Sequence, residues 1–159
     1  MRTNRARTKL ESVKPYRSTR TVLADVLSTL GTNQPSFHHS PLEQVAGLLC
    51  ESRHYSWVGI YLTVDRNSSP ALLQDAAGPH PGQMAMPGTR RKIVITMKIA
   101  GRELGFLNVE SDRENAFGSE DRVLLERVAG LLARFLTGRG KYLVRKASEP
   151  GPAIKAAAA

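Results

Sequence analysis

Side chains able to carry out covalent or metal chemistry are few in this sequence. Cys50 is the single cysteine, and it lies near the apolar side of a segment with helical spacing. A redox cysteine needs an exposed thiolate and a group that resolves the oxidised sulfur. The histidines lack the spacing of a zinc site; they are His38, His39, His54 and His80. We therefore predict that Cys50 packs as a small apolar side chain, and we predict no catalytic residue, metal site or cofactor.

Polar and aromatic side chains alternate with apolar ones near residue 108. Phe106, Asn108 and Glu110 fall on one face of a predicted strand, and Leu107 and Val109 fall on the other. The apolar face is expected to meet the helices, which leaves the polar face as a candidate small-ligand site. Two aromatic residues of another predicted strand complete this candidate site; they are Trp57 and Tyr61. The alternative is a sheet face that is only half exposed and binds nothing.

A compact cationic cluster, Arg90-Arg91-Lys92, leads into another predicted strand. Guanidinium and ammonium groups bind phosphates and carboxylates through charge-assisted hydrogen bonds. The cluster is therefore a candidate contact for an anion or an acidic partner. A solvated surface run is the alternative.

Hydrophobic spacing predicts the elements that position these residues. Apolar residues recur with helical period from residue 23 to 30, from 42 to about 54 and from 124 to 136. Alternation and β-branched or aromatic composition predict strands at 57–64, 71–77, 93–100 and 104–111, with a loop at 78–88. This order predicts an α+β domain with an antiparallel sheet and helices on one of its faces.

Three local signals mark the ends of the predicted helices. Ser40-Pro41-Leu42-Glu43 reads as a capping box, with Ser40 accepting from the backbone at Glu43. Ser119 is the predicted N-cap of the last helix. Gly138 and Gly140 are predicted to stop that helix.

The net charge of +9 is concentrated at the two ends of the sequence. Residues 1–20 carry +6 and residues 139–159 carry +4, so the remainder is close to neutral. We predict a basic, disordered segment 1–17, a domain at 18–138 and a flexible basic segment 139–159. Basic segments of this kind bind nucleic acid or acidic partners through salt-sensitive contacts, or they simply keep a protein soluble. Nucleic acid is therefore an alternative partner, although not the favoured one.

The sequence contains neither a membrane-spanning run nor the apolar stretch of a secretory signal. A single cysteine is typical of a protein in a reducing compartment. A cytoplasmic location and no contact with a membrane are the resulting expectations.

Two stretches resemble a known family. Residues 55–62 (YSWVGIYL) and 101–111 (GRELGFLNVES), the latter followed by FGSED at 117–121, are similar to GAF domains. The similarity is greatest to the group of free methionine-(R)-sulfoxide reductases. The resemblance implies terminal helices packed on one face of an antiparallel sheet, a ligand on the opposite face, and dimers formed through the terminal helices.

The sequence departs from the reductases where their chemistry is located. In those enzymes the segment before the closing hairpin is several dozen residues long and supplies the reactive cysteines, whereas residues 78–91 are fourteen and contain none. The resemblance also places the three acids of the family's site on Lys92, Asn108 and Glu110, so one acid of three is retained. A GAF-like fold shortened in its middle is therefore expected.

These observations predict a non-catalytic sensory or regulatory module. It is expected to act by binding a small ligand, by forming a homodimer through its terminal helices, or by contacting a partner protein in trans. One alternative is a protein that binds nucleic acid or an acidic partner through its basic ends. The other is a degenerate redox protein related to methionine sulfoxide reductases.

Overall fold

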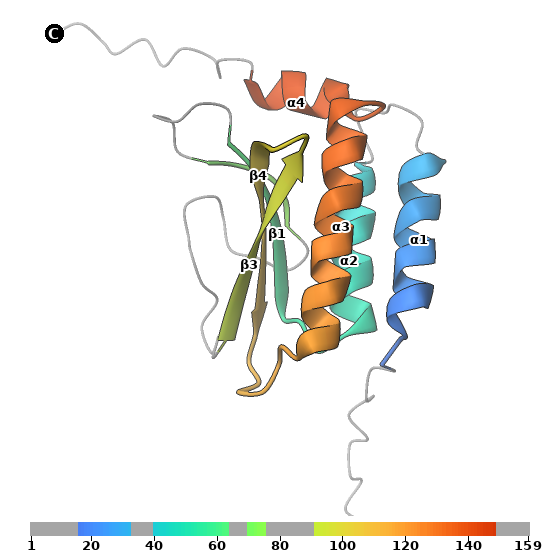
Figure 1. The fold of residues 1–159 in the computed structure, drawn as a ribbon, viewed down its shortest axis with the longest axis vertical. Helices are drawn as coiled ribbons and strands as arrows, with labels where there is room; N and C mark the ends of the chain where they lie inside the picture. Colours follow the sequence, from blue (N-terminus) through green and yellow to red (C-terminus); the bar gives the residue numbers. More distant parts are fainter. Residues whose placement is uncertain (1–15, 33–39, 64–69, 76–90, 149–159) are drawn as a thin grey trace, which may run out of the picture.

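A computed structural model gives the fold, and it describes residues 16–32, 40–63, 70–75 and 91–148. Three helices lie on one side of a four-stranded sheet, and a fourth helix crosses one end of the molecule (Figure 1). The element order predicted from the sequence is confirmed: two helices, two strands, two more strands and a helix. The whole predicted 78–88 loop, and Arg90, lie outside the described residues.

The sheet is antiparallel throughout, in the order β2-β1-β4-β3. Its strands are β1 (Trp57–Leu62), β2 (Ala71–Asp75), β3 (Arg91–Ile99) and β4 (Arg102–Ser111). Ala100 and Gly101 join β3 to β4, and both have positive φ angles, 49° and 77°. Positive φ at both central residues gives a two-residue turn the twist that matches its strands.

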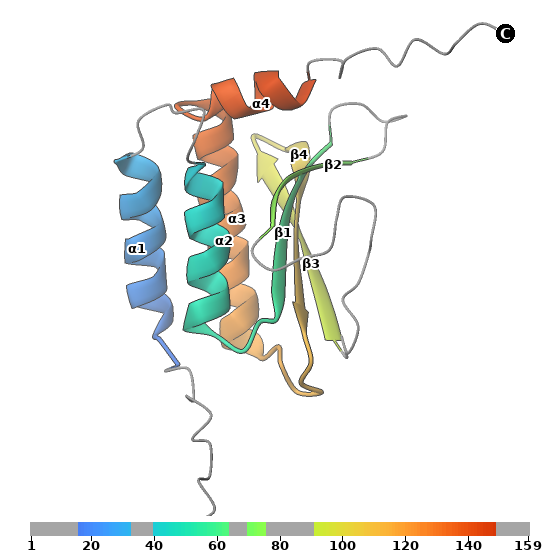
Figure 2. The same ribbon diagram turned by 180° about the vertical axis from the view of Figure 1, so that it is seen from behind.

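The helices form two layers on one face of this sheet (Figure 2). α2 (Pro41–Ser52) packs on β1 and β2, and α3 (Ser119–Thr137) packs on β3 and β4. α1 (Thr19–Gly31) packs on α2 and α3 and forms the outer layer. The main core lies between the sheet and the inner helices, where the alternate strand residues Val58, Ile60, Leu107 and Val109 are fully buried.

The apolar stripe of α1 differs from the prediction. Val22, Val26 and Leu30 are buried, whereas Leu27, which was expected on the buried stripe, is 58% exposed. The reason is that α1 touches other helices along only one narrow line of residues, so a broad apolar face is left partly uncovered.

Two predicted helix caps are corrected. Ser40 Oγ accepts from the backbone N–H of Leu42 at 3.2 Å, one residue earlier than a capping box requires. Gly118, not Ser119, is the N-cap of α3, and its backbone N–H donates to Asp121 Oδ2 at 3.0 Å. Asp121 at position N3 therefore accepts the N-cap backbone hydrogen bond of a capping box. Its negative charge also lies at the positive end of the helix dipole.

The segment 139–159, predicted to be flexible, contains a helix. α4 (Lys141–Ser148) begins three residues after Gly138, and residues beyond 148 lie outside the described part of the chain. Gly140 N–H donates to Phe135 O at 2.7 Å, so the glycines form a turn into α4 instead of ending the ordered structure. Near the other end, Tyr16 and Arg17 of the predicted 1–17 segment are described, and residues 1–15 are not.

No helix in the described ranges is long and apolar enough to cross a membrane.

Candidate functional site

The strand register brings the predicted ligand-site residues onto one face of the sheet. Trp57 of β1 lies opposite Glu110 of β4, and Tyr61 lies opposite Phe106. Gly59, between the two aromatic residues, lies opposite Asn108. Directly opposed residues of an antiparallel pair point to the same face. These side chains therefore share the face that points away from the helices.

Aromatic rings form a continuous wall along β1 and β4. The rings of Tyr61 and Phe106 stack, with centroids 4.7 Å apart and planes 13° apart. Trp57 and Tyr61 have centroids 6.3 Å apart. A Cβ added to Gly59 would lie 2.2 Å from the Trp57 ring, so the absence of a side chain there lets the indole lie against the sheet.

The polar part of this face is buried rather than half exposed. Asn108 is 5% exposed and Glu110 is fully buried. Asn108 Oδ1 and the Trp57 Nε1–H have no hydrogen-bond partner among the described residues. A buried acceptor or donor without a partner costs about 1–3 kcal/mol. Two such atoms on one face indicate a place for groups that the described residues do not supply.

The cationic cluster is not a single patch within the described residues. Arg91 and Lys92 are consecutive residues of β3 and therefore point to opposite faces of the sheet. Arg91 Nε donates to the backbone oxygen of Glu114 at 3.0 Å. Lys92 lies opposite Glu110 in the register, so its Cα is placed at the rim of the candidate ligand face.

Cys50 lies on α2, which covers the helix-side face of the sheet. Its side chain is half buried and packs against the core, on the other side of the sheet from Asn108 and Glu110. The described residues contain no group of three or more His, Cys, Asp or Glu side chains that could hold a metal ion. His38, His39 and His80 lie outside the described ranges.

Comparison with solved structures identifies the fold. The free methionine-R-sulfoxide reductase of Neisseria meningitidis, solved in complex with its substrate, matches with a TM-score of 0.66 at 20% identity, over 78% of this chain and 91% of that one. A putative GAF sensor protein of Burkholderia vietnamiensis matches with a TM-score of 0.59 at 18% identity, over 80% and 96%. The GAF domain of a Coxiella burnetii phosphoenolpyruvate-protein phosphotransferase matches at 0.58 and 15%, over 79% and 96%.

The chain has a GAF-like fold. No protein-family model matches the sequence, and no curated protein matches it. The resemblance stated from residues 55–62 and 101–111 is therefore confirmed for the fold, which reductases and non-reductase GAF domains share.

A buried ionic cluster, which sequence reasoning missed, ties the start of this GAF-like domain to its last long helix. Arg53 and Asp121 are 1% and 7% exposed, and Arg53 Nη1 lies 3.4 Å from Asp121 Oδ1. The Tyr55 hydroxyl donates to the same Oδ1 at 2.6 Å. Burial and then the Asp121 carboxylate raise the pKa of Tyr55 far above its ordinary value. On the N-terminal side, Arg53 donates to Tyr16 and to Thr19, and its guanidinium lies 3.9 Å from the Tyr16 ring centroid.

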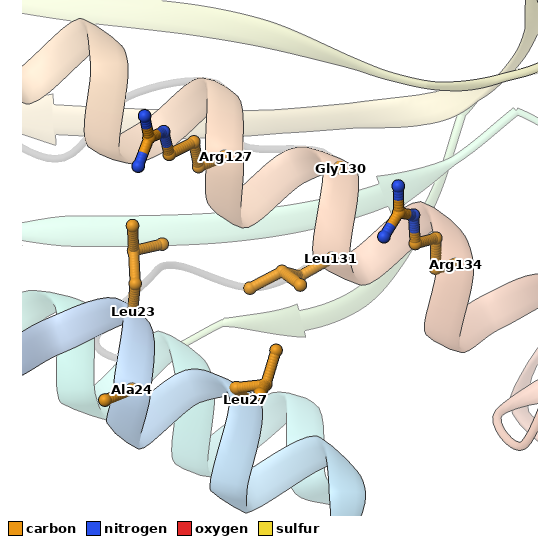
Figure 3. Close-up of a pocket in the computed structure, with 7 residues that line it drawn as sticks. All are labelled: Leu23, Ala24, Leu27, Arg127, Gly130, Leu131 and Arg134. Atoms are coloured by element: carbon orange, nitrogen blue, oxygen red, sulfur yellow. The ribbon is translucent and has the colours of Figure 1, made fainter. Parts of the chain in front are cut away.

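The outer surface of the GAF-like domain carries an apolar groove between α1 and α3, with a volume of about 430 Å³ (Figure 3). Leu23 and Leu27 reach into it from α1, and Leu131 reaches into it from α3. Arg127 and Arg134 flank Leu131 along α3. In the sequence this site is visible only as surplus leucines on the helix faces, since the pairing of α1 with α3 is a tertiary feature.

Proposed function

We propose that this protein is a non-catalytic regulatory module that binds a small ligand on the helix-free face of its sheet. The observation that carries the proposal is a pair of buried atoms on that face, Asn108 Oδ1 and Trp57 Nε1, which have no hydrogen-bond partner in the described part of the chain. The ligand would donate a hydrogen bond to Asn108 and accept one from Trp57. GAF-like domains commonly bind small ligands, which makes this face the natural place for one.

The neighbouring residues restrict the chemistry of the ligand further. Tyr61 and Phe106 offer stacked rings to an apolar or planar group. Glu110 places a carboxylate beside Trp57 in the register and suits a positively charged or amide N–H group. An amino acid or a nucleobase derivative has both the donor and the acceptor that these side chains require. The solved reductase from Neisseria meningitidis was captured with its substrate, so free methionine sulfoxide belongs in the test panel as a ligand.

Thermal unfolding with a panel of free amino acids, methionine sulfoxide and nucleotides tests the proposal. A ligand present at 100 times its Kd stabilises the folded state by about 2.7 kcal/mol, which is a readily measured rise in Tm. Asn108→Leu removes the unsatisfied acceptor. We expect the ligand-free variant to have a higher Tm than the wild type, because a buried acceptor without a partner is removed. We also expect the ligand to cause no rise in Tm, because its hydrogen-bond acceptor on the protein is gone.

Trp57→Phe and Asn115→Leu complete the comparison. Trp57→Phe removes the indole donor but keeps an aromatic ring, and it should weaken binding without unfolding the domain. Asn115 is exposed in the turn after β4, so its substitution should change neither binding nor the ligand-free Tm appreciably. A ligand that binds Asn108→Leu as tightly as the wild type would refute the assignment of this face.

We propose, second, that the α1–α3 groove receives an acidic amphipathic helix from a partner protein. Leu27 is 58% exposed beside Leu23 and Leu131, and an exposed apolar groove of this kind is typical of helix-in-groove recognition. Arg127 and Arg134 are seven residues apart, two helical turns or about 10.5 Å along α3. Neither arginine has an ion-pair partner among the described residues. Carboxylates seven residues apart on the incoming helix would match them.

Charge favours this partner over a second copy of the chain. A two-fold antiparallel pairing of α3 helices around Gly130 would bring Arg127 of one copy toward Arg134 of the other. Like charges at an interface cost free energy. This repulsion disfavours a homodimer through the α1–α3 groove. A homodimer, which the sequence led us to expect, is the alternative to the partner helix at this surface.

Anisotropy with a labelled Leu/Glu amphipathic peptide separates the two occupants. We expect binding that Leu27→Glu abolishes and that Arg127→Glu/Arg134→Glu weakens. A peptide with lysines in place of its glutamates should restore binding to the charge-reversed variant. Arg113→Glu, an exposed charge change at the far end of β4, is the matched control. Light scattering that shows a dimer dissociated by Leu27→Glu, with no peptide binding, would replace this proposal with self-association.

A further inference from the structure

A second pocket lies at the end of the sheet where β1 finishes and β4 begins, under α4. Its volume is about 300 Å³, at the lower end of the range of roughly 300–1,000 Å³ for small-molecule sites. It shares no lining residue with the α1–α3 groove and contains none of the candidate ligand-face residues. The pocket is lined by Leu62, Arg102, Leu104, Leu136, Thr137, Lys141, Val144 and Arg145.

The turn between α3 and α4 places two of the three cations of α4, Lys141 and Arg145, at this pocket. Gly138 N–H and Gly140 N–H both donate to Phe135 O, and at this turn the chain changes direction so that α4 crosses the end of α3 (Figure 1). A Cβ on Gly140 would lie 2.5 Å from the Phe135 ring, so this close turn requires glycine. Lys141 and Arg145 are four residues apart and lie on one side of α4. The helix crosses the end of α3 close to the end of the sheet (Figure 1).

The pocket combines an apolar floor with a cationic rim. Leu62 and Leu136 are buried, and Leu104 and Val144 are partly buried against the core. Arg102 of β4 lines the pocket together with Lys141 and Arg145 of α4. No carboxylate lines the pocket, and none of the three cations forms an ion pair in the described part of the chain. The acid next to Arg102, Glu103, lies 3.6 Å from Lys98.

Arg102, Lys141 and Arg145 are exposed cations around an apolar floor, and no carboxylate of the described residues forms an ion pair with them. Like charges repel one another, and a neighbouring anion relieves that repulsion. An anion held by several guanidinium or ammonium groups is bound through charge-assisted hydrogen bonds, each stronger than a neutral one. The leucines below would cover an apolar chain attached to that anion.

We propose that this pocket binds an anionic amphiphile, a carboxylate or phosphate group carrying a short apolar chain. Arg102, Lys141 and Arg145 hold the anionic head, and Leu62, Leu104, Leu136 and Val144 cover the chain. The site is separate from the sheet face of the proposed regulatory ligand, so either proposal can fail without the other. Two of the basic residues after residue 138, Lys141 and Arg145, would then contribute to a ligand site.

Calorimetric titration of the full chain with octanoate and octyl phosphate tests the proposal. We expect both to bind, and we expect octanol, acetate and inorganic phosphate to bind at least tenfold more weakly because each lacks one half of the required chemistry. Arg145→Gln and Arg102→Gln should each raise the Kd about tenfold, and higher salt should weaken binding further. Equal affinity for octanol and octyl phosphate would overturn the cationic site.

Two variants and a vesicle assay test whether the amphiphile binds in this pocket. Val144→Glu places a carboxylate in the pocket and should abolish binding, whereas Arg113→Gln removes an exposed cation near the opposite end of β4 and should leave the Kd unchanged. Sedimentation with phosphatidylglycerol vesicles distinguishes a lipid headgroup from a free amphiphile. Binding to vesicles without binding to octyl phosphate would overturn the pocket in favour of a surface contact by α4, and an unchanged Kd in Arg145→Gln would overturn it as well.

Discussion

At the scale of single residues, the face of the sheet and the ionic cluster differ in how far the sequence could reveal them. Asn108, Glu110, Trp57 and Tyr61 were predictable because strand alternation places side chains two residues apart on one face. The Arg53–Asp121 contact joins residues 68 positions apart. No local pattern marks it, since Arg53 reads as a polar residue ending a helix and Asp121 as one of two acids opening another.

Asp121→Ala should be among the most destabilising single substitutions in the chain. It removes the acceptor of Tyr55 and of Gly118 N–H, and it removes the carboxylate that pairs with the buried Arg53 guanidinium. Breaking a buried pair on one side costs about 3–5 kcal/mol. Urea denaturation gives the change in the free energy of unfolding.

Glu126→Ala provides the matched control for that substitution. Glu126 pairs with Arg122 at 3.5 Å on the exposed side of α3, where an i,i+4 pair contributes about 0.3–0.5 kcal/mol. A loss on Asp121→Ala no greater than the loss on Glu126→Ala would show that the buried cluster contributes little to the stability of the fold.

The pKa of Tyr55 predicts a loss of stability at high pH. Burial, with the Asp121 carboxylate, raises the pKa of Tyr55 well above its ordinary value of 10. Above pH 10 the unfolded chain loses the phenolic proton while the folded protein keeps it, so the unfolded state becomes favoured. The contribution is therefore intact below pH 10 and falls by about 1.4 kcal/mol for each pH unit above it.

Comparing wild type with Tyr55→Phe isolates this contribution. Between pH 9 and pH 11 the wild type should lose about 1.4 kcal/mol more unfolding free energy than the variant. Parallel pH profiles for the two proteins would contradict the raised pKa.

At the scale of elements, the sequence predicts those whose pattern is periodic and misses those defined by packing. The four strands and three longer helices follow from alternation and helical spacing. α4 was missed because it is short, carries three basic residues and follows two glycines, a combination that also marks an unstructured end. Its stabilisation comes from Leu143 and Val144 packing on the core, a contact that requires the turn at Gly138–Gly140.

The pairing of β1 with β4 depends on a close backbone approach at Gly105. A Cβ there would lie 1.9 Å from the backbone oxygen of Tyr61, and a backbone atom cannot move aside as a flexible side chain can. Gly105→Ala should therefore lower the unfolding free energy by about 3 kcal/mol or more. It should also disturb Tyr61 and its stacked partner Phe106.

Gly47→Ala is the opposite case and serves as the control. Gly47 lies inside α2 with no heavy atom within 4 Å of an added Cβ. Alanine is about 1 kcal/mol more favourable than glycine inside a helix, so this variant should unfold at a higher temperature than the wild type. A Gly105→Ala protein as stable as Gly47→Ala would mean that the two strands can separate at low cost.

At the scale of the whole molecule, the fold separates two chemistries that a reductase must combine. The sheet face that carries Asn108 and Glu110 points away from the helices, whereas Cys50 lies on α2, in the helix layer. The sheet lies between them (Figure 2). Similarity to a reductase at 20% identity extends to the arrangement of the backbone, and the reacting groups must be judged residue by residue.

The position and number of thiols predict that this protein does not reduce methionine sulfoxide. Reduction of a sulfoxide to a sulfide by thiols consumes two electrons and leaves a disulfide, so a second thiol from another molecule would have to resolve Cys50, the single cysteine of this sequence. Cys50 would also have to cross the sheet to reach a ligand on the opposite face.

We expect no NADPH-coupled turnover of free methionine sulfoxide above the background of the thioredoxin system, in wild type and Cys50→Ala alike. If methionine sulfoxide raises the Tm in the same preparation, the absence of turnover reflects a binding site without a nucleophile. Turnover by the wild type that disappears in Cys50→Ala would show instead that the thiol reaches the sheet face, and the regulatory assignment would then give way to an enzyme.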